Sequence, residues 1–194
     1  MHRGSYSTEQ MIALHAFFAE GAAAGEAALA DLSGCTTEVE VVEVRCGALD
    51  EFGERGLRVG DDLVAAVVGR FEGGLAGSMA LALEPEEAFA WARMGDPADP
   101  LEAFQSLARG LLEGVASALS EALHAPISLS AAGGLIEASE PCLLAGTHAP
   151  ADTLVVSARL RITARDETLS AAVHVLLVPK SFARVLAALS APIH

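Results

Sequence analysis

The sequence predicts a mixed α/β (α+β) fold in which a unit of long helix, strand, hairpin and short helix occurs twice with pseudo-twofold symmetry. Apolar residues make up 52% of the 194 residues and charged residues only 20%, so one sizeable core is expected. Residues 75–85 (LAGSMALALEP) align with residues 169–179 (LSAAVHVLLVP) at an offset of 94. The duplication favours one antiparallel sheet with the two long helices packed on one of its faces.

The first half of the duplication spans residues 8–94. Thr8 is expected to cap its first helix, Ser33-Gly34 to end that helix, and Gly73-Gly74 to turn a hairpin. Alternation of valine with glutamate in TEVEVVEVRC is typical of a half-buried strand. The buried stripe of the first helix is expected to contain Met11, Leu14, Phe17, Phe18, Leu29 and Leu32. We expect helices over 8–32 and 86–94 and strands over 37–46, 62–72 and 75–83.

The second half spans residues 101–190 and repeats this order, so that residues 1–194 form a single domain. Its long helix is expected to bury Leu107, Leu111 and Leu119. A loose stretch rich in Gly and Pro separates the strand that begins at Ile127 from the second hairpin, which turns at Asp166-Glu167. We expect helices over 101–124 and 180–189 and strands over 153–163 and 168–178.

Composition excludes several classes of function. The net charge is −14 and no basic stripe with interleaved aromatic residues occurs, so neither nucleic acid nor an anionic membrane surface is an expected partner. The single lysine, Lys180, follows a proline, which excludes a P-loop. No apolar run reaches the roughly 18–20 residues that span a bilayer. Three cysteines without paired spacing favour reduced thiols and a cytoplasmic protein.

No metal or cofactor is expected. None of the six histidines stands at ligand spacing from another histidine, a cysteine or a helical carboxylate. His174 lies inside an apolar strand and is interpreted as a buried structural residue, and Cys142 is interpreted as structural too. The helical carboxylates are expected at solvated positions; they are Glu20, Glu26, Glu102, Glu113 and Glu121.

The order of elements and the apolar pattern resemble the CheC/CheX/FliY family of chemotaxis phosphatases, whose fold is also that of the middle domain of the flagellar switch protein FliM. The resemblance is carried by residues 13–29, 62–94, 113–129 and 153–186, and it covers nearly the whole chain. It implies a protein partner, which could be a phosphorylated receiver domain, a flagellar switch component or a receptor-modifying protein. Relatives form dimers by pairing sheet edges or helices, so a homodimer is a further expectation.

The family's active helix carries an acidic or serine residue, a glutamate and an asparagine on one face. In the family, the glutamate anchors the phosphorylated receiver and the asparagine amide orients the water that attacks the aspartyl phosphate. The resemblance places this pair at Ala16 and Ala19 in the first helix, and at Ser106 and Arg109 in the second. Glu102 then takes the leading position of the second helix.

The chain contains no asparagine, so neither helix holds the pair. Ala131 stands where the family has a proline downstream of the second helix. Gln105 and Glu102 are the nearest substitutes, and Gln105 supplies the right amide in a different register. The resemblance therefore implies the fold without a standard catalytic pair.

Three functions follow from these observations. The first is a CheC-like signalling protein that binds its partner without the standard phosphatase activity. The second is an active aspartyl-phosphate phosphatase with a divergent site that uses Gln105, Glu102 or Glu113. The third is a scaffold unrelated to chemotaxis that uses the fold for oligomerisation.

Overall fold

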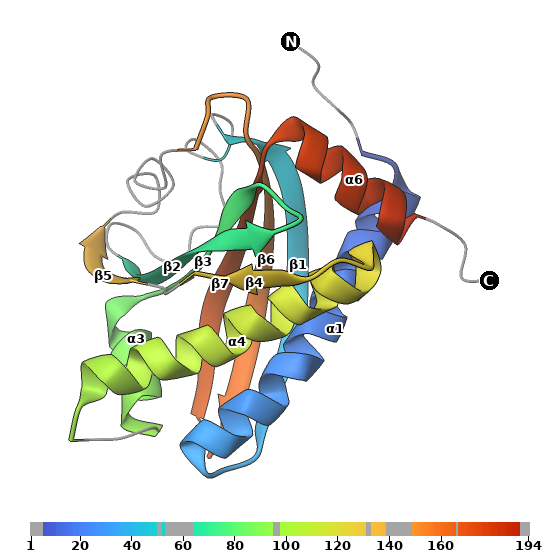
Figure 1. Ribbon diagram of the computed structural model, residues 1–194. Helices are drawn as coiled ribbons and strands as arrows, with labels where there is room; N and C mark the ends of the chain where they lie inside the picture. The colour runs from blue at the N-terminus through green and yellow to red at the C-terminus, as the bar shows by residue number, and fades with distance from the viewer. Residues whose placement is uncertain are drawn as a thin grey trace.

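A computed structural model describes residues 6–49, 52, 64–94, 98–130, 133–138, 149–165 and 167–190, with residues 133–138 described as backbone. Four helices and a seven-stranded sheet make up this part of the chain, and every strand pairing is antiparallel. The two long helices lie together across one face of the sheet (Figure 1). The predicted fold class is confirmed.

The first half begins with helix α1 (Thr8–Ser33) and strand β1 (Thr37–Ala48). The cap of α1 is Ser7 rather than Thr8, because Gln10 completes a capping box with it: the Gln10 N–H donates to Ser7 Oγ and the Ser7 N–H donates to Gln10 Oε1. Gly34 ends the helix in the left-handed conformation, at φ 65°. Hairpin strands β2 (Val64–Gly73) and β3 (Gly77–Leu83) and helix α3 (Pro85–Met94) follow.

The second half begins with helix α4 (Pro100–Leu123) and the short strand β4 (Ile127–Leu129). Strand β5 (Gly133–Ala138) pairs with β2, although the sequence predicts no strand in this stretch. Hairpin strands β6 (Leu154–Ala164) and β7 (Glu167–Leu177) and helix α6 (Pro179–Leu189) complete the fold. Arg165 enters the turn at φ 49°, whereas Asp166, part of the predicted turn, lies outside the described residues, as do Ala131 and Cys142.

The strand order β1-β6-β7-β3-β2-β4 has the symmetry of the duplication. Exchanging β1 with β4, β2 with β6 and β3 with β7 reproduces the same order in reverse. Ala80 and His174 stand 94 residues apart, the offset of the repeat, and they are direct partners in the β3–β7 ladder. The pseudo-twofold axis therefore passes through this pair, and each half contributes strands to both sides of the sheet.

Two equivalent hydrogen bonds repeat the symmetry in the side chains. In α3, Glu87 Oε1 accepts from the Ser170 N–H at 2.9 Å; in α6, Ser181 Oγ accepts from the Ala76 N–H at 3.1 Å. The two donors, Ala76 and Ser170, are 94 residues apart, and so are the two acceptors, Glu87 and Ser181. Each short helix thus accepts a hydrogen bond from a backbone N–H of the other half. Each of these N–H groups lies just beyond the end of the β3–β7 ladder.

The large side chains predicted to face the core are buried, with 3% or less exposed; they are Leu14, Phe17, Phe18, Leu107, Leu111 and Leu119. Leu32 was expected in the same stripe but is 48% exposed. Leu32 stands in the last turn of α1. One of its Cδ atoms lies over Gly110 of α4, and the rest of the side chain faces solvent. Aside from this last turn, the helical period predicted the buried face of α1.

The two long helices approach closely because glycines line their crossing. Gly114 of α4 lies between Gly21 and Gly25 of α1: a Cβ at Gly114 would be 2.5 Å from the Gly25 nitrogen and 2.6 Å from the Gly21 carbonyl oxygen. Gly21 faces Val115 and Gly25 faces Leu111, so the helices run antiparallel. This crossing leaves no room for side chains between the two backbones.

We expect Gly114→Ala to destabilise the protein by about 2 kcal/mol or more, because the added methyl group meets backbone atoms rather than a movable side chain. Gly110→Ala is the matched control, since its Cβ would meet the Ala28 methyl at 3.2 Å. Its helix-propensity gain of about 1 kcal/mol offsets this tighter contact, so its stability should stay within about 1 kcal/mol of the parent. Chemical denaturation measures both values, and equal stabilities for the two variants would contradict this description of the crossing.

His174 makes stability depend on pH. The side chain is fully buried on the face of the sheet away from α1 and α4, and His174 Nδ1 shares a hydrogen bond of 2.6 Å with Ser157 Oγ. Burial lowers the pKa of His174 to about 4. The unfolded chain binds this proton near pH 6.5 and the folded chain only near pH 4, so His174 removes about 3 kcal/mol of stability as the pH falls through that interval.

We therefore expect His174→Gln to flatten the loss of stability between pH 6.5 and pH 4, as measured by urea denaturation at a series of pH values. His124→Gln is the matched control, because His124 is exposed at the end of α4. A pH dependence that is the same in both variants would show that His174 does not resist protonation.

Candidate functional site

The outer face of α4 holds the residues that the resemblance singles out. Glu102, Glu113, Ser117, Glu121 and Arg109 are exposed, and Ser106 is half-buried between them. Their spacing of three or four residues places all six on one line, which we call the outer stripe of α4. The opposite side of the helix is buried against α1 and the sheet, so the packing of α4 fixes which residues face outward.

The predicted site residues of α4 fall together in its first three turns. Ser106 and Arg109, to which the resemblance assigns the glutamate and asparagine positions, lie on the outer stripe with Glu102. Gln105 is half-buried on the flank of this stripe, one helical turn beyond Leu101. Asp99 caps the helix by accepting from the Glu102 N–H at 3.0 Å.

The corresponding positions of α1 lie elsewhere. Ala16 and Ala19 are both exposed, but α1 runs antiparallel to α4, so these methyl groups lie near the far end of the helix pair from Ser106 and Arg109. Helix α1 contains no lysine or arginine. The two pairs of positions that the resemblance singles out therefore lie on separate surfaces, and only the pair on α4 has polar side chains.

The chemistry available on α4 differs from that of the family. An amide can donate to and accept from a water molecule, whereas a guanidinium only donates and a methyl group does neither. Arg109 is the only cation of α4, and within the described residues it forms no ion pair. The outer stripe can attract an anion at Arg109, and it carries no amide side chain.

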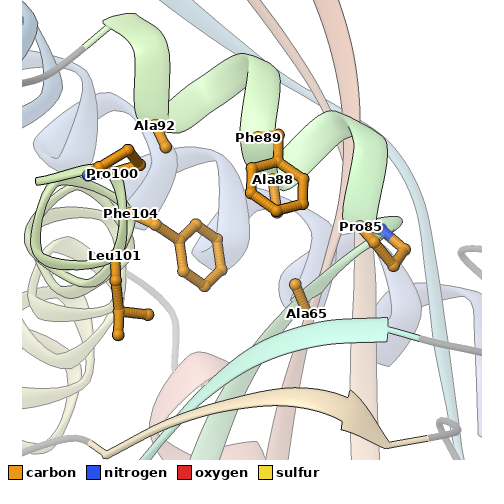
Figure 2. A pocket seen from close by; sticks show the side chains of 8 residues that line it. All are labelled: Ala65, Pro85, Ala88, Phe89, Ala92, Pro100, Leu101 and Phe104. Carbon is orange, nitrogen blue, oxygen red and sulfur yellow. The ribbon is translucent and has the colours of Figure 1, made fainter. Parts of the chain in front are cut away.

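A small apolar pocket of about 60 Å³ opens beside this stripe. Its walls come from three elements: Ala65 of β2, Ala88 and Phe89 of α3, and Leu101 and Phe104 of α4 (Figure 2). Phe89 is 59% exposed and Leu101 is 47% exposed, which makes them two of the largest apolar groups on the described surface. No sequence pattern predicted this pocket.

The free edge of β1 is partly covered by side chains of α1. The Val39 N–H donates to Glu26 Oε1 at 2.7 Å, and His15 Nε2 shares a hydrogen bond of 3.2 Å with the Val41 carbonyl. Glu26 was expected on the solvated surface, but it is partly buried and has this structural role. The edge of the sheet is thereby less available for pairing with another strand.

Other candidate groups have no site chemistry. Among the described residues, no three His, Cys, Asp or Glu side chains gather where they could hold a metal ion. Cys35 and Cys46 are free thiols, and burial raises the pKa of Cys46 to about 11, so it is not a nucleophile at neutral pH. Burial also raises the pKa of Glu87, against the opposing effect of its bond from Ser170. None of the described helices has the length and apolarity to cross a membrane.

Solved structures identify the class of fold. The chain has a CheC/CheX/FliY-like fold. FliY of Thermotoga maritima superposes with a TM-score of 0.75 at 12% identity, over 96% of this chain and 98% of that one. The middle domain of FliM from H. pylori gives 0.64 at 12% identity, over 94% and 99% of the two chains. A chain of the FliG–FliM complex from H. pylori gives 0.66 at 12% identity, over 94% and 100%.

No protein-family model and no curated protein matches the sequence. The similarity therefore lies in the arrangement of elements, and the identities of the outward residues have to be interpreted from this chain alone.

Proposed function

We propose that this protein is a CheC-like component of chemotaxis or two-component signalling in the cytoplasm, which binds a receiver domain or a flagellar switch protein without the standard phosphatase activity. The observation that carries the proposal is the outer face of α4. It keeps an exposed polar stripe at the family's site but replaces the glutamate and asparagine by Ser106 and Arg109. In this proposal the outer stripe serves as the binding surface, and it lacks the asparagine amide that orients the water in the family.

Complexes of structurally similar proteins support a protein partner. FliM from H. pylori has been crystallised with FliG and with SpeE. In the present chain, the outer stripe of α4 and the adjacent apolar pocket combine charged and apolar groups, as protein interfaces do. A homodimer through the β1 edge is not part of this proposal, because Glu26 and His15 bond to that edge.

Electrostatics argues against hydrolysis at this face. A phosphorylated receiver presents an aspartyl phosphate together with a bound divalent cation. The Arg109 guanidinium attracts the phosphate but repels the cation, and the effect grows as the interface excludes water. Because the guanidinium has no acceptor, it cannot hold the water in line with the phosphorus. Binding without acceleration is the expected outcome.

The proposal is tested by measuring the lifetime of phosphorylated receiver domains from the same organism, labelled with acetyl phosphate, with and without this protein. At least one receiver or switch protein should bind in a titration, while the phosphoryl lifetime of each receiver changes less than twofold. A lifetime shortened tenfold or more, about 1.4 kcal/mol of barrier, would show an active phosphatase and direct attention to Gln105 and Glu102. Absence of binding to every receiver and switch protein would refute the proposal.

Restoring the family pair extends the same assay. Ser106→Glu combined with Arg109→Asn should shorten the lifetime of a bound receiver, because it returns the anchor and the amide to the outer stripe. Ser117→Glu combined with Glu121→Asn is the matched control, since both residues are exposed on the same stripe three turns further along α4. Equal lifetimes with the restored and control variants would mean that this part of α4 does not face the phosphoryl group.

A further inference from the structure

The pocket between α3 and α4 lies at a place where the two halves of the duplication differ. Ala88 lines it, and the residue 94 positions later is Phe182 of α6, which is 4% exposed. In the second half, the Phe182 ring fills the space beneath the short helix, and Tyr6 packs edge-on against it with ring centroids 5.6 Å apart. The first half has a methyl group where the second half has an aromatic ring, and a hollow remains.

Phe89 and Leu101 stand at the mouth of the pocket, and both remain substantially exposed. In the second half, the position equivalent to Phe89 is Ala183. The large exposed apolar rim therefore surrounds the place where Ala88 stands instead of a ring, which is the arrangement expected where an external side chain completes the packing.

The size and surroundings of the pocket define what could fill it. A cavity of about 150 Å³ holds a benzene ring, so about 60 Å³ accommodates a branched aliphatic group rather than a whole ring. Glu86, Asp99 and Glu102 are exposed beside the lining residues, against one cation, Arg93. The rim is therefore predominantly acidic, and it favours a partner with positive charge around its apolar anchor.

We propose that the α3–α4 pocket is the anchor site for an amphipathic helix of the partner protein, which inserts one leucine-sized side chain between Phe89 and Leu101 and carries lysine or arginine on either side of it. The inference rests on the proposed function, and it specifies the partner surface that the same face of α4 recognises. Leu101, Gln105 and Arg109 follow one another at intervals of four residues. A helix anchored in the pocket thus continues directly onto the candidate site.

The single tryptophan of the chain allows a direct test. Trp91 is 1% exposed and packs edge-on against Phe104, with centroids 6.3 Å apart, and Phe104 lines the pocket. The probe is a synthetic helical peptide with lysines flanking one leucine, titrated into the intact protein while Trp91 fluorescence and peptide anisotropy are recorded. We expect saturable binding at least tenfold tighter than for the same peptide with alanine for the leucine or glutamates for the lysines.

Matched variants locate the binding. Ala88→Leu fills the pocket from within and should weaken peptide binding at least tenfold, whereas Ala183→Leu adds the same atoms to the exposed face of α6 and should have no effect. Leu101→Ala should weaken binding, and Leu32→Ala, with a side chain equally exposed on α1, should not. Glu102→Lys should weaken it, and Glu20→Lys, at an exposed position of α1, should not. Leu101→Ala and Glu102→Lys keep the test decisive if Ala88→Leu does not fold.

Failure of this inference is distinguishable from failure of the proposed function. A receiver or switch protein that binds the parent and the Ala88→Leu variant equally would overturn the pocket as an anchor and leave the proposed function standing. Peptide binding that is abolished by Ala88→Leu, in a protein that binds no receiver or switch protein, would refute the proposed function and retain the anchor. Absence of peptide binding, or binding insensitive to both Leu101→Ala and Ala88→Leu, overturns the inference.

Discussion

The close crossing of α1 and α4 is the constraint on which the functional surface depends. With Gly114 seated between Gly21 and Gly25, the two helices are fixed against each other and against the sheet beneath them. The inward residues of α4 are buried against α1 and the sheet, and this packing fixes the rotation of α4 about its axis. The rotation in turn determines which residues face outward. That arrangement places Glu102, Ser106 and Arg109 on the surface, where a partner can contact them without any rearrangement of the core.

The two halves of the duplication form one sheet together, and the surface that we propose as functional lies where the two halves differ. Each half contributes strands to both sides of the sheet, and each short helix accepts a hydrogen bond from a backbone N–H of the opposite half. Where the halves differ, the differences are local: a ring at Phe182 against a methyl at Ala88, and exposed methyl groups on α1 against polar groups on α4. These differences, rather than the shared framework, distinguish the side of the molecule that we propose as the binding surface.

Much of the fold could be predicted from the sequence because its signals are periodic. The helices, the strands β1, β2, β3, β6 and β7, and the duplication follow from apolar spacing and from the repeat at an offset of 94. Strand β5 was missed because GGLIEA lacks a clear alternation and forms only by pairing with β2. The cap at Ser7 could have been found, since Gln10 stands three residues after it, whereas Thr8 has no such partner at Met11.

Only part of the candidate site could be predicted from the sequence. A resemblance can assign positions such as Ser106 and Arg109, but a pocket depends on where side-chain volume is absent. Comparing Ala88 with Phe182 at the repeat offset would have indicated the missing volume, yet only the structure shows that Phe89 and Leu101 leave the space open. The exposure of Glu26 was predicted incorrectly because its hydrogen bond to Val39 arises from tertiary packing.

In the proposed complex, the partner contacts the first turns of α4 together with α3. Amide chemical-shift mapping of the intact protein, titrated with the receiver or switch protein that it binds, locates this contact. We expect the largest shifts in α3 and in residues 100–113 of α4, with the β1–β6 side of the sheet unchanged. Shifts concentrated on β1 and β6, with α3 and α4 unaffected, would contradict it.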